Sequence, residues 1–598
     1  MNIDKMQDAP LKRQEVVLEH EETVGEVHLV NPLQSQAIDQ VVTNATTFAA
    51  QHGLEEYTQA LQKGALLAQH HGAFNNLEAL TAEERNILQR EAEHKWHHPS
   101  ALYRLIILCS IAAAVNGMDL VSINGANIFF PKQFGIDGPG RQTWILGLVN
   151  SAPYFCCTVF SVWLTAPLNR RWGRRGVMFV TAFFCFAACI WSACTNTWWH
   201  LMIARIFLGI GLGPKSATLS VYAAECAPAR IRGALTMCWQ IWVAFGIMLG
   251  TACNIAFYHV PDRSGIVGLN WRLMLGIAGL PALVVMAVVY TNPESPRWLM
   301  LKGRYREAFK SLQALRGSDI QAARDLYYIH VLLEEESKYQ AHQKNVPIIQ
   351  LFTIRRNRNA VIGSSLVMFA QQYCGINVMS YYSTNIFSQA GASPSHALLA
   401  SWGFGMLNFI FAFPAVRTID TFGRRKLLLC TFPLMTIFLL MAAGGFYATD
   451  STTKMAVVAV GVYLYVIAYS PGEGPVPFVY SAEAFPLAVR DVGMSFAVFV
   501  CWGFNSIVGL TFPSILDKFT PPGAFFWYAG WNALLTVAIY LFLPETKALS
   551  LEELDVVFDM PMATHAAFHI RAIPSNFRRY ILRQDVPKKT LYSFEEEK

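Results

Sequence analysis

The stretch FAQQYCGINVMSYYST, residues 369–384, decides how this chain folds. It lies inside an apolar run that is too long for the core helix of a soluble protein and about the right length to cross a bilayer. It nevertheless carries Gln371, Gln372 and Asn377, and an amide without a partner in hydrocarbon costs on the order of several kcal/mol. On a straight helix Gln371 and Asn377 point about 120° apart, but Gly375 lies between them where a helix can bend. The stretch therefore predicts the wall of a polar pathway that suits a neutral, hydroxyl-rich ligand, with helix packing as the alternative.

The composition of the whole chain fits a membrane protein. Its 598 residues are 53% hydrophobic and 15% charged, which excludes disorder and argues against an ordinary soluble fold. The net charge of +6 is spread over short loops, so no nucleic-acid partner is expected. The 12 cysteines lie in or beside apolar segments without metal-ligand spacing, so we interpret them as packing residues and expect no metal or cofactor. The sequence shows no nucleophile–base pair, so we do not expect an enzyme.

Residues 1–98 form a polar, acid-rich extension in which the sequence predicts short amphipathic helices. Its clearest apolar stripe consists of Leu54, Tyr57, Leu61 and Ala65. The run TAEE at residues 81–84 predicts a capping box at the start of a short helix. We expect a solvated cytoplasmic extension without a chemical role.

Twelve segments from residue 102 onward are long and apolar enough to cross a bilayer of about 30 Å. They are expected at residues 102–130, 144–164, 177–194, 201–222, 235–257, 273–290, 360–388, 397–416, 427–446, 455–480, 494–513 and 524–543. Basic residues cluster after the second, fourth and eighth segments and in the loop 297–358, whereas the opposite loops are nearly bare. By the positive-inside rule, both termini and the long middle loop are cytoplasmic.

The two halves of the chain repeat each other. GRR at 173–175 recurs at 423–425, AECAPARIR at 224–232 recurs as AEAFPLAVR at 482–490, and PES at 293–295 recurs as PET at 544–546. The members of each pair are separated by about 250 residues, which is typical of two parallel six-helix halves with a site between them. The sequence thus divides into an extension (1–98), a first bundle (99–292), an intracellular helical loop (293–358), a second bundle (359–546) and a C-terminal tail (547–598).

These motifs resemble the sugar-porter family of the major facilitator superfamily, in particular its fungal members. The resemblance covers residues 102–555 and rests on the GRR loops, PESPRWL at 293–299, QQYCGIN at 371–377, GPVPFVYSAE at 474–483 and PETKALSLEEL at 544–554. It implies an all-α membrane protein with twelve transmembrane helices in two pseudo-symmetric bundles. It also implies alternating access, in which the bundles rock about a midplane site and expose it to one side at a time.

The resemblance assigns a substrate site to polar and aromatic side chains at membrane depth. The positions that match the family's sugar-hydroxyl ligands are Gln240, Gln371, Gln372, Asn377, Asn408 and Asn505, and Trp502 matches its aromatic residue. All are uncharged hydrogen-bonding or flat apolar groups, which suit the hydroxyl rim and the C–H face of a pyranose or cyclitol. Helix packing is the alternative role for each of them.

Two charged residues match the family's proton-coupling pair. Asp119, in GMD at 117–119, corresponds to the coupling aspartate, and Arg205 corresponds to its arginine partner. A carboxylate inside a span costs about 2.5–3.5 kcal/mol on insertion scales, so it marks a proton relay by default. We expect Arg205 to hold the charged form of Asp119, with a purely static ion pair as the alternative.

A further set resembles the ionic lock that holds the cytoplasmic ends of the bundles together when the site faces outward. Its members are Arg174, Glu225, Arg232, Asp420, Arg424, Glu483 and Arg490. These residues gate conformations and do not touch substrate. Asp420 keeps the acidic position three residues before the loop glycine, whereas the first half has Arg170 there, so the lock is asymmetric.

Three positions depart from the family pattern and bear on the substrate. Phe478 replaces the usual tryptophan and loses an indole donor, and Cys501 replaces an asparagine and loses an amide. Lys215 stands where many relatives carry a small or hydroxylic residue, and an ammonium inside a span is expensive. It either neutralises an acidic substrate or, as we prefer, pairs with a carbonyl or reaches a water-filled cavity.

The sequence therefore predicts a multi-pass plasma-membrane carrier, expected to be monomeric, that imports a hexose, myo-inositol or another polyol with a proton. Its partners would be this substrate, the proton and the lipid bilayer. One alternative is a facilitator or a carrier of a sugar acid such as quinate, for which Lys215 is the only hint. Another is a transporter-like nutrient sensor, which ranks last because the C-terminal tail is short and the N-terminal one lacks an obvious binding motif.

Overall fold

The computed structural model is helical, and it contains no strand among the residues it describes. These are residues 33, 36–69, 77, 79–94, 96–262, 265–342, 347–486, 489–547, 551–580, 584 and 591. Within these ranges, eight helical runs are long and apolar enough to cross a membrane. Two of the eight, Arg141–Ala193 and Val492–Phe542, each contain two passes. The eight runs therefore supply ten passes. The helix α9 and the broken pair α17–α18, whose bounds follow, supply two more, in agreement with the twelve expected passes.

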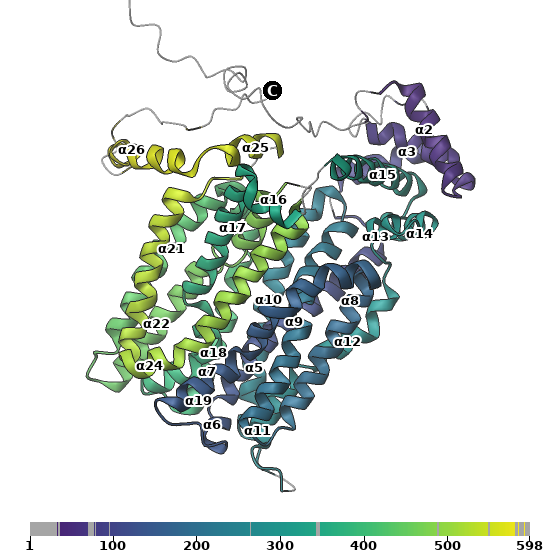
Figure 1. Cartoon of the computed structure of the whole chain (residues 1–598). Coiled ribbons are helices and arrows are strands. Elements are labelled where there is room, and N and C mark those ends of the chain that lie inside the picture. The colour runs from purple at the N-terminus through teal and green to yellow at the C-terminus, as the bar shows by residue number, and fades with distance from the viewer. Residues whose placement is uncertain are drawn as a thin grey trace, which may run out of the picture.

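Six passes form each half, and Figure 1 shows the halves side by side, the first in blue and the second in green and yellow. The first half contains α5 (Ser100–Ala126); α7 (Arg141–Cys156), which continues through η3 (Cys157–Ser161) into α8 (Val162–Ala193); α9 (Trp198–Cys226); α10 (Ala229–Tyr258); and α11 (Leu269–Ile277) with α12 (Leu280–Val288). The second half contains α17 (Arg355–Tyr373) with α18 (Ile376–Gln389), α19 (Pro394–Ala412), α21 (Arg424–Gly445), α22 (Ser451–Tyr469) and the long run α24 (Arg490–Phe542). Short helices connect them: α6 (Phe130–Gln133), η4 (Val289–Thr291), α16 (Pro347–Thr353), α20 (Ala415–Phe422) and α23 (Val476–Ala484).

Local breaks in the backbone divide the long helical runs into passes. Gly173 inside α8 has a φ of 73°, and Thr520 inside α24 has a φ of 60°. Gly375, between α17 and α18, has a φ of 105°, a left-handed value that glycine adopts without the steric cost of a side chain. The bend predicted at Gly375 is therefore confirmed.

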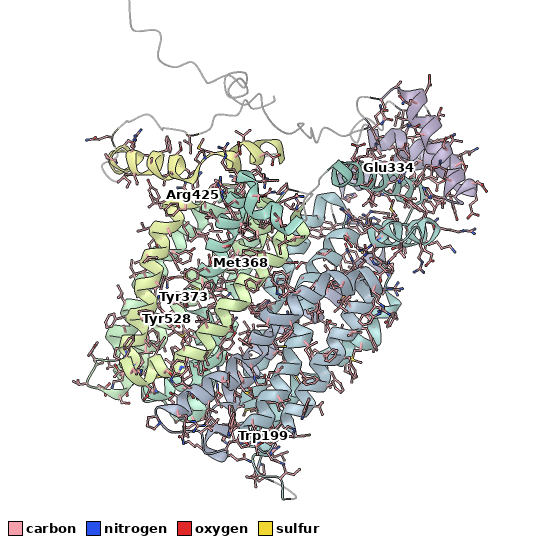
Figure 2. All side chains as sticks on the ribbon, viewed as in Figure 1. Trp199, Glu334, Met368, Tyr373, Arg425 and Tyr528 are labelled. Atoms are coloured by element: carbon pink, nitrogen blue, oxygen red, sulfur yellow. The ribbon has the colours of Figure 1, made fainter. Side chains whose placement is uncertain are left out.

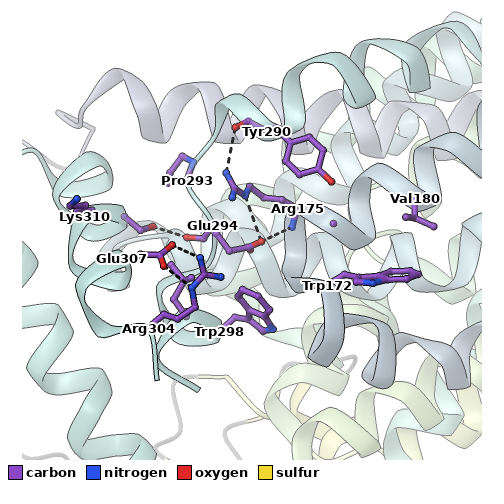
Figure 3. Close-up of a pocket in the computed structure, with 13 residues that line it drawn as sticks. Trp172, Arg175, Val180, Tyr290, Pro293, Glu294, Trp298, Arg304, Glu307 and Lys310 are labelled. Atoms are coloured by element: carbon purple, nitrogen blue, oxygen red, sulfur yellow. Dashed lines mark hydrogen bonds and ion pairs between the residues drawn. The ribbon is translucent and has the colours of Figure 1, made fainter. Parts of the chain in front are cut away.

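The repeated motifs form equivalent turns in the two halves. Glu294 accepts a hydrogen bond from the backbone N–H of Arg174 at 3.1 Å, and Glu545 accepts one from the backbone N–H of Arg424 at 2.8 Å. Glu294 also contacts Arg175, as Figure 3 shows. The glycine that opens each turn has a φ of 73° (Gly173) or 90° (Gly423), which favours glycine, and a Cβ there would also lie 2.6 Å from the glutamate oxygen. The sequence repeat is therefore a structural repeat.

The halves meet mainly where α7 packs on α24, α10 on α19 and α5 on α18. Figure 2 places Glu334 and Trp199 at opposite ends of the molecule. We refer to the end with Glu334, where Figure 1 shows the terminal helices, as the tail side, and to the end with Trp199 as the far side.

The described part of the N-terminal extension is folded onto the loop helices between the halves, which corrects the expectation of a solvated segment. It contains α2 (Ile38–Gln51), η1 (Glu55–Tyr57), α3 (Thr58–Gln69) and α4 (Ala82–Glu93). These helices pack on α13 (Pro296–Leu301), α14 (Tyr305–Arg316) and α15 (Asp319–His342) around buried Phe48, Leu61 and Phe309. The predicted capping box is confirmed, because Thr81 and Glu84 exchange both side chain–backbone hydrogen bonds. The apolar stripe of the extension thus covers the loop helices rather than facing water.

Two further helices, α25 (Leu551–Asp559) and α26 (Met562–Tyr580), lie on the tail side of the second half (Figure 1). Arg355 pairs with Asp559 and Arg356 pairs with Asp555, each at 2.7 Å, so the start of α17 anchors α25. Each half therefore carries its own terminal helices.

Candidate substrate and proton sites

The bend at Gly375 brings together the three amides that a straight helix would separate. Asn377 Nδ2 donates to Gln372 Oε1, and Gln372 Nε2 donates to Gln371 Oε1 at 3.3 Å. All three side chains are buried, with exposed fractions between 2% and 8%. A continuous chain of amides thus lines the junction of α17 and α18, and none of the three faces lipid.

The second wall of this amide cluster comes from the turn between α22 and α23 and from α24. Gln371 Nε2 donates to the carbonyl oxygens of Glu473 at 3.4 Å and Gly474 at 3.3 Å. Gln372 Nε2 donates to the sulfur of Cys501 at 3.1 Å. Cys501 therefore keeps a weak polar contact at the position where the family has an asparagine.

Three stacked rings connect the halves beside the amides. Trp502 on α24 stacks on Tyr154 on α7 with ring centroids 5.5 Å apart, and Tyr154 stacks on Tyr381 on α18 at 5.4 Å. The Tyr381 hydroxyl donates to Asn505 Oδ1 at 2.7 Å. The indole Nε1 of Trp502 is buried and has no hydrogen-bond partner in the described structure, so it is a donor available to a ligand. Sequence reasoning missed Tyr154, although Tyr381 lay inside the opening stretch.

The remaining two predicted ligands take different positions. Gln240 on α10 is half-buried, and its side chain reaches the α22–α23 turn. If Gly474 in this turn carried a Cβ, that atom would lie 3.6 Å from the Gln240 side chain. It therefore approaches from the first half the same turn that Gln371 contacts from the second. Asn408 on α19 instead accepts a hydrogen bond from Ser470 at 3.0 Å, which connects it to the end of α22.

Asp119 pairs with Lys215 and not, as predicted, with Arg205. The distance from Lys215 Nζ to Asp119 Oδ2 is 3.7 Å, and both side chains are at most 3% exposed. Arg205 donates to the backbone carbonyls of Val149 at 3.0 Å and Asn150 at 3.3 Å. The two cations lie on α9 ten residues apart, which corresponds to about 15 Å along a helix axis. Asp119 is therefore paired with the cation at its own depth.

The contacts of Lys215 also differ from those predicted. Besides Asp119, its ammonium lies 3.3 Å from the sulfur of Cys185, and Cys189 donates to the other Asp119 oxygen at 3.5 Å. The ammonium therefore neither contacts a carbonyl in these interactions nor reaches solvent. A buried charge costs less when an oppositely charged partner lies beside it, and this explains how a lysine can lie inside α9.

The predicted gate residues form two similar clusters on the tail side. Arg174 contacts Glu225 at 2.7 Å and Arg424 contacts Glu483 at 2.6 Å, so each ion pair lies within one half. The asymmetry predicted at Asp420 is visible, because this residue adds a second carboxylate to Arg424 at 3.1 Å.

Arg490 donates to the carbonyl of Phe485 at 3.2 Å within the second half. The side chain of Arg232 lies outside the described residues.

Hydrogen bonds join the two halves toward the far side. Asn124 Nδ2 donates to Ser383 at 2.7 Å, and Asn124 Oδ1 accepts the backbone N–H of Thr384 at 3.2 Å. Asn150 donates to the Tyr382 hydroxyl at 2.9 Å. These contacts hold α18 against α5 and α7, so the halves are closed against each other there.

This architecture defines a class of protein: a membrane transporter with two six-helix halves, an amide and aromatic cluster at their interface and a buried charge pair. Comparison with known sequences identifies the family. Residues 50–558 match the family described as "Sugar (and other) transporter", so the chain belongs to the sugar porters of the major facilitator superfamily. Since members of this family are transporters, the chain is not an enzyme.

Individual relatives agree with this assignment. The chain is 31% identical over 478 residues to the putative polyol transporter 1 of Arabidopsis thaliana, which covers 76% of this chain and 90% of that protein. It is also 31% identical over 464 residues to the arabinose-proton symporter of Escherichia coli K12, covering 76% of this chain and 93% of that protein. The partially occluded, inward-open structure of the xylose transporter XylE from E. coli superposes with a TM-score of 0.65 at 26% identity, over 75% of this chain and 100% of that chain.

Proposed function

We propose that this protein imports a sugar or polyol of hexose or myo-inositol type together with protons by alternating access. Among the relatives are an arabinose-proton symporter, polyol transporters and a myo-inositol transporter. The buried pair of Asp119 and Lys215 supports this mechanism most directly. It places a carboxylate that can take up a proton inside the first half, and the two halves must move against each other during transport. The protein acts as a monomer in the plasma membrane, and its tail side, with both termini, faces the cytoplasm.

The substrate binds at the amide and aromatic cluster. Gln371, Gln372 and Asn377 offer amide donors and acceptors to hydroxyl groups, and the face of Trp502 suits the C–H face of the ring. Gln240, Asn408 and Asn505 complete the set, and Gln240 reaches the cluster from the opposite half. A ligand that bridges these groups would pull the two halves together, which is what a carrier requires of its substrate.

The proton acts at Asp119. A proton on this carboxylate would leave Lys215 without a counter-charge, and losing one partner of a buried ion pair costs about 3–5 kcal/mol. Protonation would therefore weaken the contact between α5 and α9 and favour the rearrangement of the first half. The gate residues Arg174, Glu225, Arg232, Asp420, Arg424, Glu483 and Arg490 then control how the tail side closes.

A sugar acid is the second candidate substrate, and Lys215 was the hint that favoured it. In the structure the ammonium of Lys215 is already compensated by Asp119, so it is not available as a counter-charge for a substrate carboxylate. A neutral hydroxyl-rich substrate is therefore the better fit.

The function is tested by uptake of labelled hexoses, pentoses, cyclitols, polyols and sugar acids in cells that lack their own transporters. Each coupled proton supplies about 2.3 kcal/mol per 100 mV plus about 1.4 kcal/mol per pH unit, enough for accumulation of several hundredfold at −100 mV and one pH unit. We expect accumulation of a neutral substrate that a protonophore abolishes. Uptake that ignores external pH and the protonophore would identify a facilitator, and exclusive uptake of acids would overturn the substrate class.

A further inference from the structure

Glu473 is a buried carboxylic acid of the second half, in the turn between α22 and α23. Its side chain is fully buried, with an exposed fraction of 0%. Neither carboxyl oxygen has a hydrogen-bond partner among the described residues. This contrasts with Asp119, which has an ammonium 3.7 Å away. The two acids therefore lie in opposite halves and in opposite electrostatic surroundings.

The groups around Glu473 do not compensate a negative charge. The titratable side chains that interact with it electrostatically are Cys374 beside the α17–α18 bend, Tyr465 and Tyr469 on α22, and Cys501 on α24. All four are neutral groups at physiological pH. Within the described part of the chain, no Lys, Arg or His acts on Glu473.

The hydroxyl of Tyr465, one of these neighbours, is also already used as a donor. The Tyr465 hydroxyl donates to the carbonyl of Cys374 at 3.0 Å, and Asn532 donates to the same carbonyl at 2.9 Å. An ionised carboxylate in such a place would bear the full cost of burial without a partner that compensates its charge. A protonated carboxyl avoids this cost, so Glu473 carries a proton in the conformation seen here.

Glu473 is coupled to the substrate site through its own backbone. Its carbonyl oxygen and that of Gly474 accept the two hydrogen bonds from Gln371 Nε2. When a substrate hydroxyl competes for Gln371, the turn loses contacts that hold it against the α17–α18 bend. The side chain of Glu473 moves with this turn, and any movement that admits water to it allows the proton to leave.

We propose that Glu473 is a second proton-binding site of the transport cycle, which takes up a proton when the carrier is open to the outer solution, holds it while the turn is closed and releases it when the turn opens to the cytoplasm. The proposal rests on the sugar–proton symport proposed above and extends it from one coupled proton to two, one at Asp119 and one at Glu473. The balance is simple: each site takes a proton from the outer solution and releases it to the inner one, and no bond of the substrate changes.

The experiment measures how many protons move with each substrate molecule. Purified protein in liposomes, with the membrane potential clamped at zero, is given a hundredfold gradient of the substrate that the uptake panel identifies. Since each proton contributes a factor of ten per pH unit, an opposing gradient of one unit stops net flux if two protons are coupled, and two units are needed if one is. We expect one unit for the wild type and two units for Glu473→Gln.

The controls separate this proposal from the general function. Glu473→Asp keeps a carboxyl and should retain the balance at one pH unit, which a role in packing alone does not predict. If the wild type needs an opposing gradient of two pH units to stop net flux, the second site is overturned while symport stands. The second site is also overturned if net flux through Glu473→Gln still stops at one pH unit. Wild-type flux that ignores the pH gradient would refute symport itself. If Glu473→Gln does not transport, the pH gradient that stops net flux in the wild type still decides whether one or two protons are coupled.

Discussion

At the scale of single residues, the proposed substrate site predicts that the amide chain determines how tightly substrate binds. Removing Gln371 or Asn377 leaves a neighbouring buried amide unpaired as well as removing a contact to substrate. Such a loss costs about 1–3 kcal/mol. We therefore expect Gln371→Ala and Asn377→Ala to raise the half-saturation concentration for uptake about five- to hundredfold.

The matched control for these variants is Asn169→Ala. Asn169 is a buried amide that donates to Thr218 at 2.9 Å, outside the amide cluster, so its removal should lower stability without changing the half-saturation concentration. Surface expression must be equal for all variants. Wild-type kinetics in both cluster variants would mean that these amides serve only helix packing.

The pair of Asp119 and Lys215 is predicted to behave as one energetic unit. Asp119→Asn or Lys215→Met leaves one buried charge uncompensated, which costs about 3–5 kcal/mol, whereas replacing both residues is close to neutral. Thermal unfolding of the purified proteins should show two strongly destabilised single variants and a double variant near the wild type. Additive losses in the double variant would show that the two charges do not depend on each other.

The same variants separate stability from coupling. Asp119→Asn should abolish accumulation and the pH dependence of uptake while it keeps substrate binding, measured as quenching of tryptophan fluorescence. The double variant should recover stability without recovering accumulation, because it has no carboxylate to protonate at this position.

At the scale of helices, the bend at Gly375 decides where the amides lie. A Cβ at this position would lie 3.5 Å from Tyr528, which is ordinary contact distance, so the cost of a side chain is conformational rather than steric. For a non-glycine residue at a φ of 105° this cost is about 1–3 kcal/mol. We expect Gly375→Ala to lower thermal stability by that amount and to weaken substrate binding.

Gly444→Ala provides the comparison for this helix-level prediction. Gly444 lies inside α21 with nothing within 4 Å of an added Cβ, so alanine should be neutral or stabilising there by up to about 1 kcal/mol. If Gly375→Ala were as well tolerated as Gly444→Ala, the left-handed bend would not be what positions the amides.

The helical passes and the bend could be predicted from sequence because both depend on local information. The length of an apolar run determines a pass, and Gly375 between two amides indicates the bend. The partner of Asp119 could not be predicted, because Arg205 and Lys215 share α9 and nothing in the two segments specifies the relative depth of α5. The stripe containing Leu61 indicated amphipathic helices correctly, but the surface it covers belongs to loop helices far along the chain.

At the scale of the whole molecule, charged contacts fix the N-terminal extension to the first half. Arg324 on α15 binds Glu91 on α4 at 2.9 Å and Asp325 at 2.9 Å. Asp325 also binds Arg316 at 2.7 Å, and Arg316 donates to the carbonyl of Cys226 at the end of α9. The extension is thereby connected, through four side chains, to the residue that follows Glu225 of the gate.

Removal of Arg324 should loosen this connection. Arg324→Ala leaves Glu91 without its cation, so we expect limited proteolysis to cut the extension faster than in the wild type. Arg306→Ala is the matched control, because the pair of Arg306 and Glu56 is half-exposed on both sides and such pairs contribute about 0–1 kcal/mol. Equal cutting of the two variants would show that the apolar contacts alone hold the extension.

The same cluster gives a pH dependence. Burial opposes ionisation of Asp325 most strongly, yet the charges of Arg324 and Arg316 outweigh it and lower its pKa to about 2. Burial likewise opposes ionisation of Glu91, whose pKa is lowered overall, chiefly by Arg324. Depressed carboxyl pKa values stabilise the docked state above about pH 4 and lose that contribution as the pH falls toward 2. The protection of the α4 amides, that is, their exchange rate relative to the intrinsic rate at each pH, should therefore be high at neutral pH and fall steeply below pH 4, whereas unchanged protection would contradict the assignment.

Each terminal segment is fastened to one bundle: α3 packs on α15 beside the first, while α25 and α26 contact α17 and α24 of the second. These terminal helices are thus two markers, each attached to one of the two moving halves and outside the route of the substrate. A donor dye on α3 and an acceptor dye on α26 would convert the angle between the bodies into an energy-transfer signal. In single molecules, that signal would time the opening and closing of the carrier while the binding site stays unlabelled.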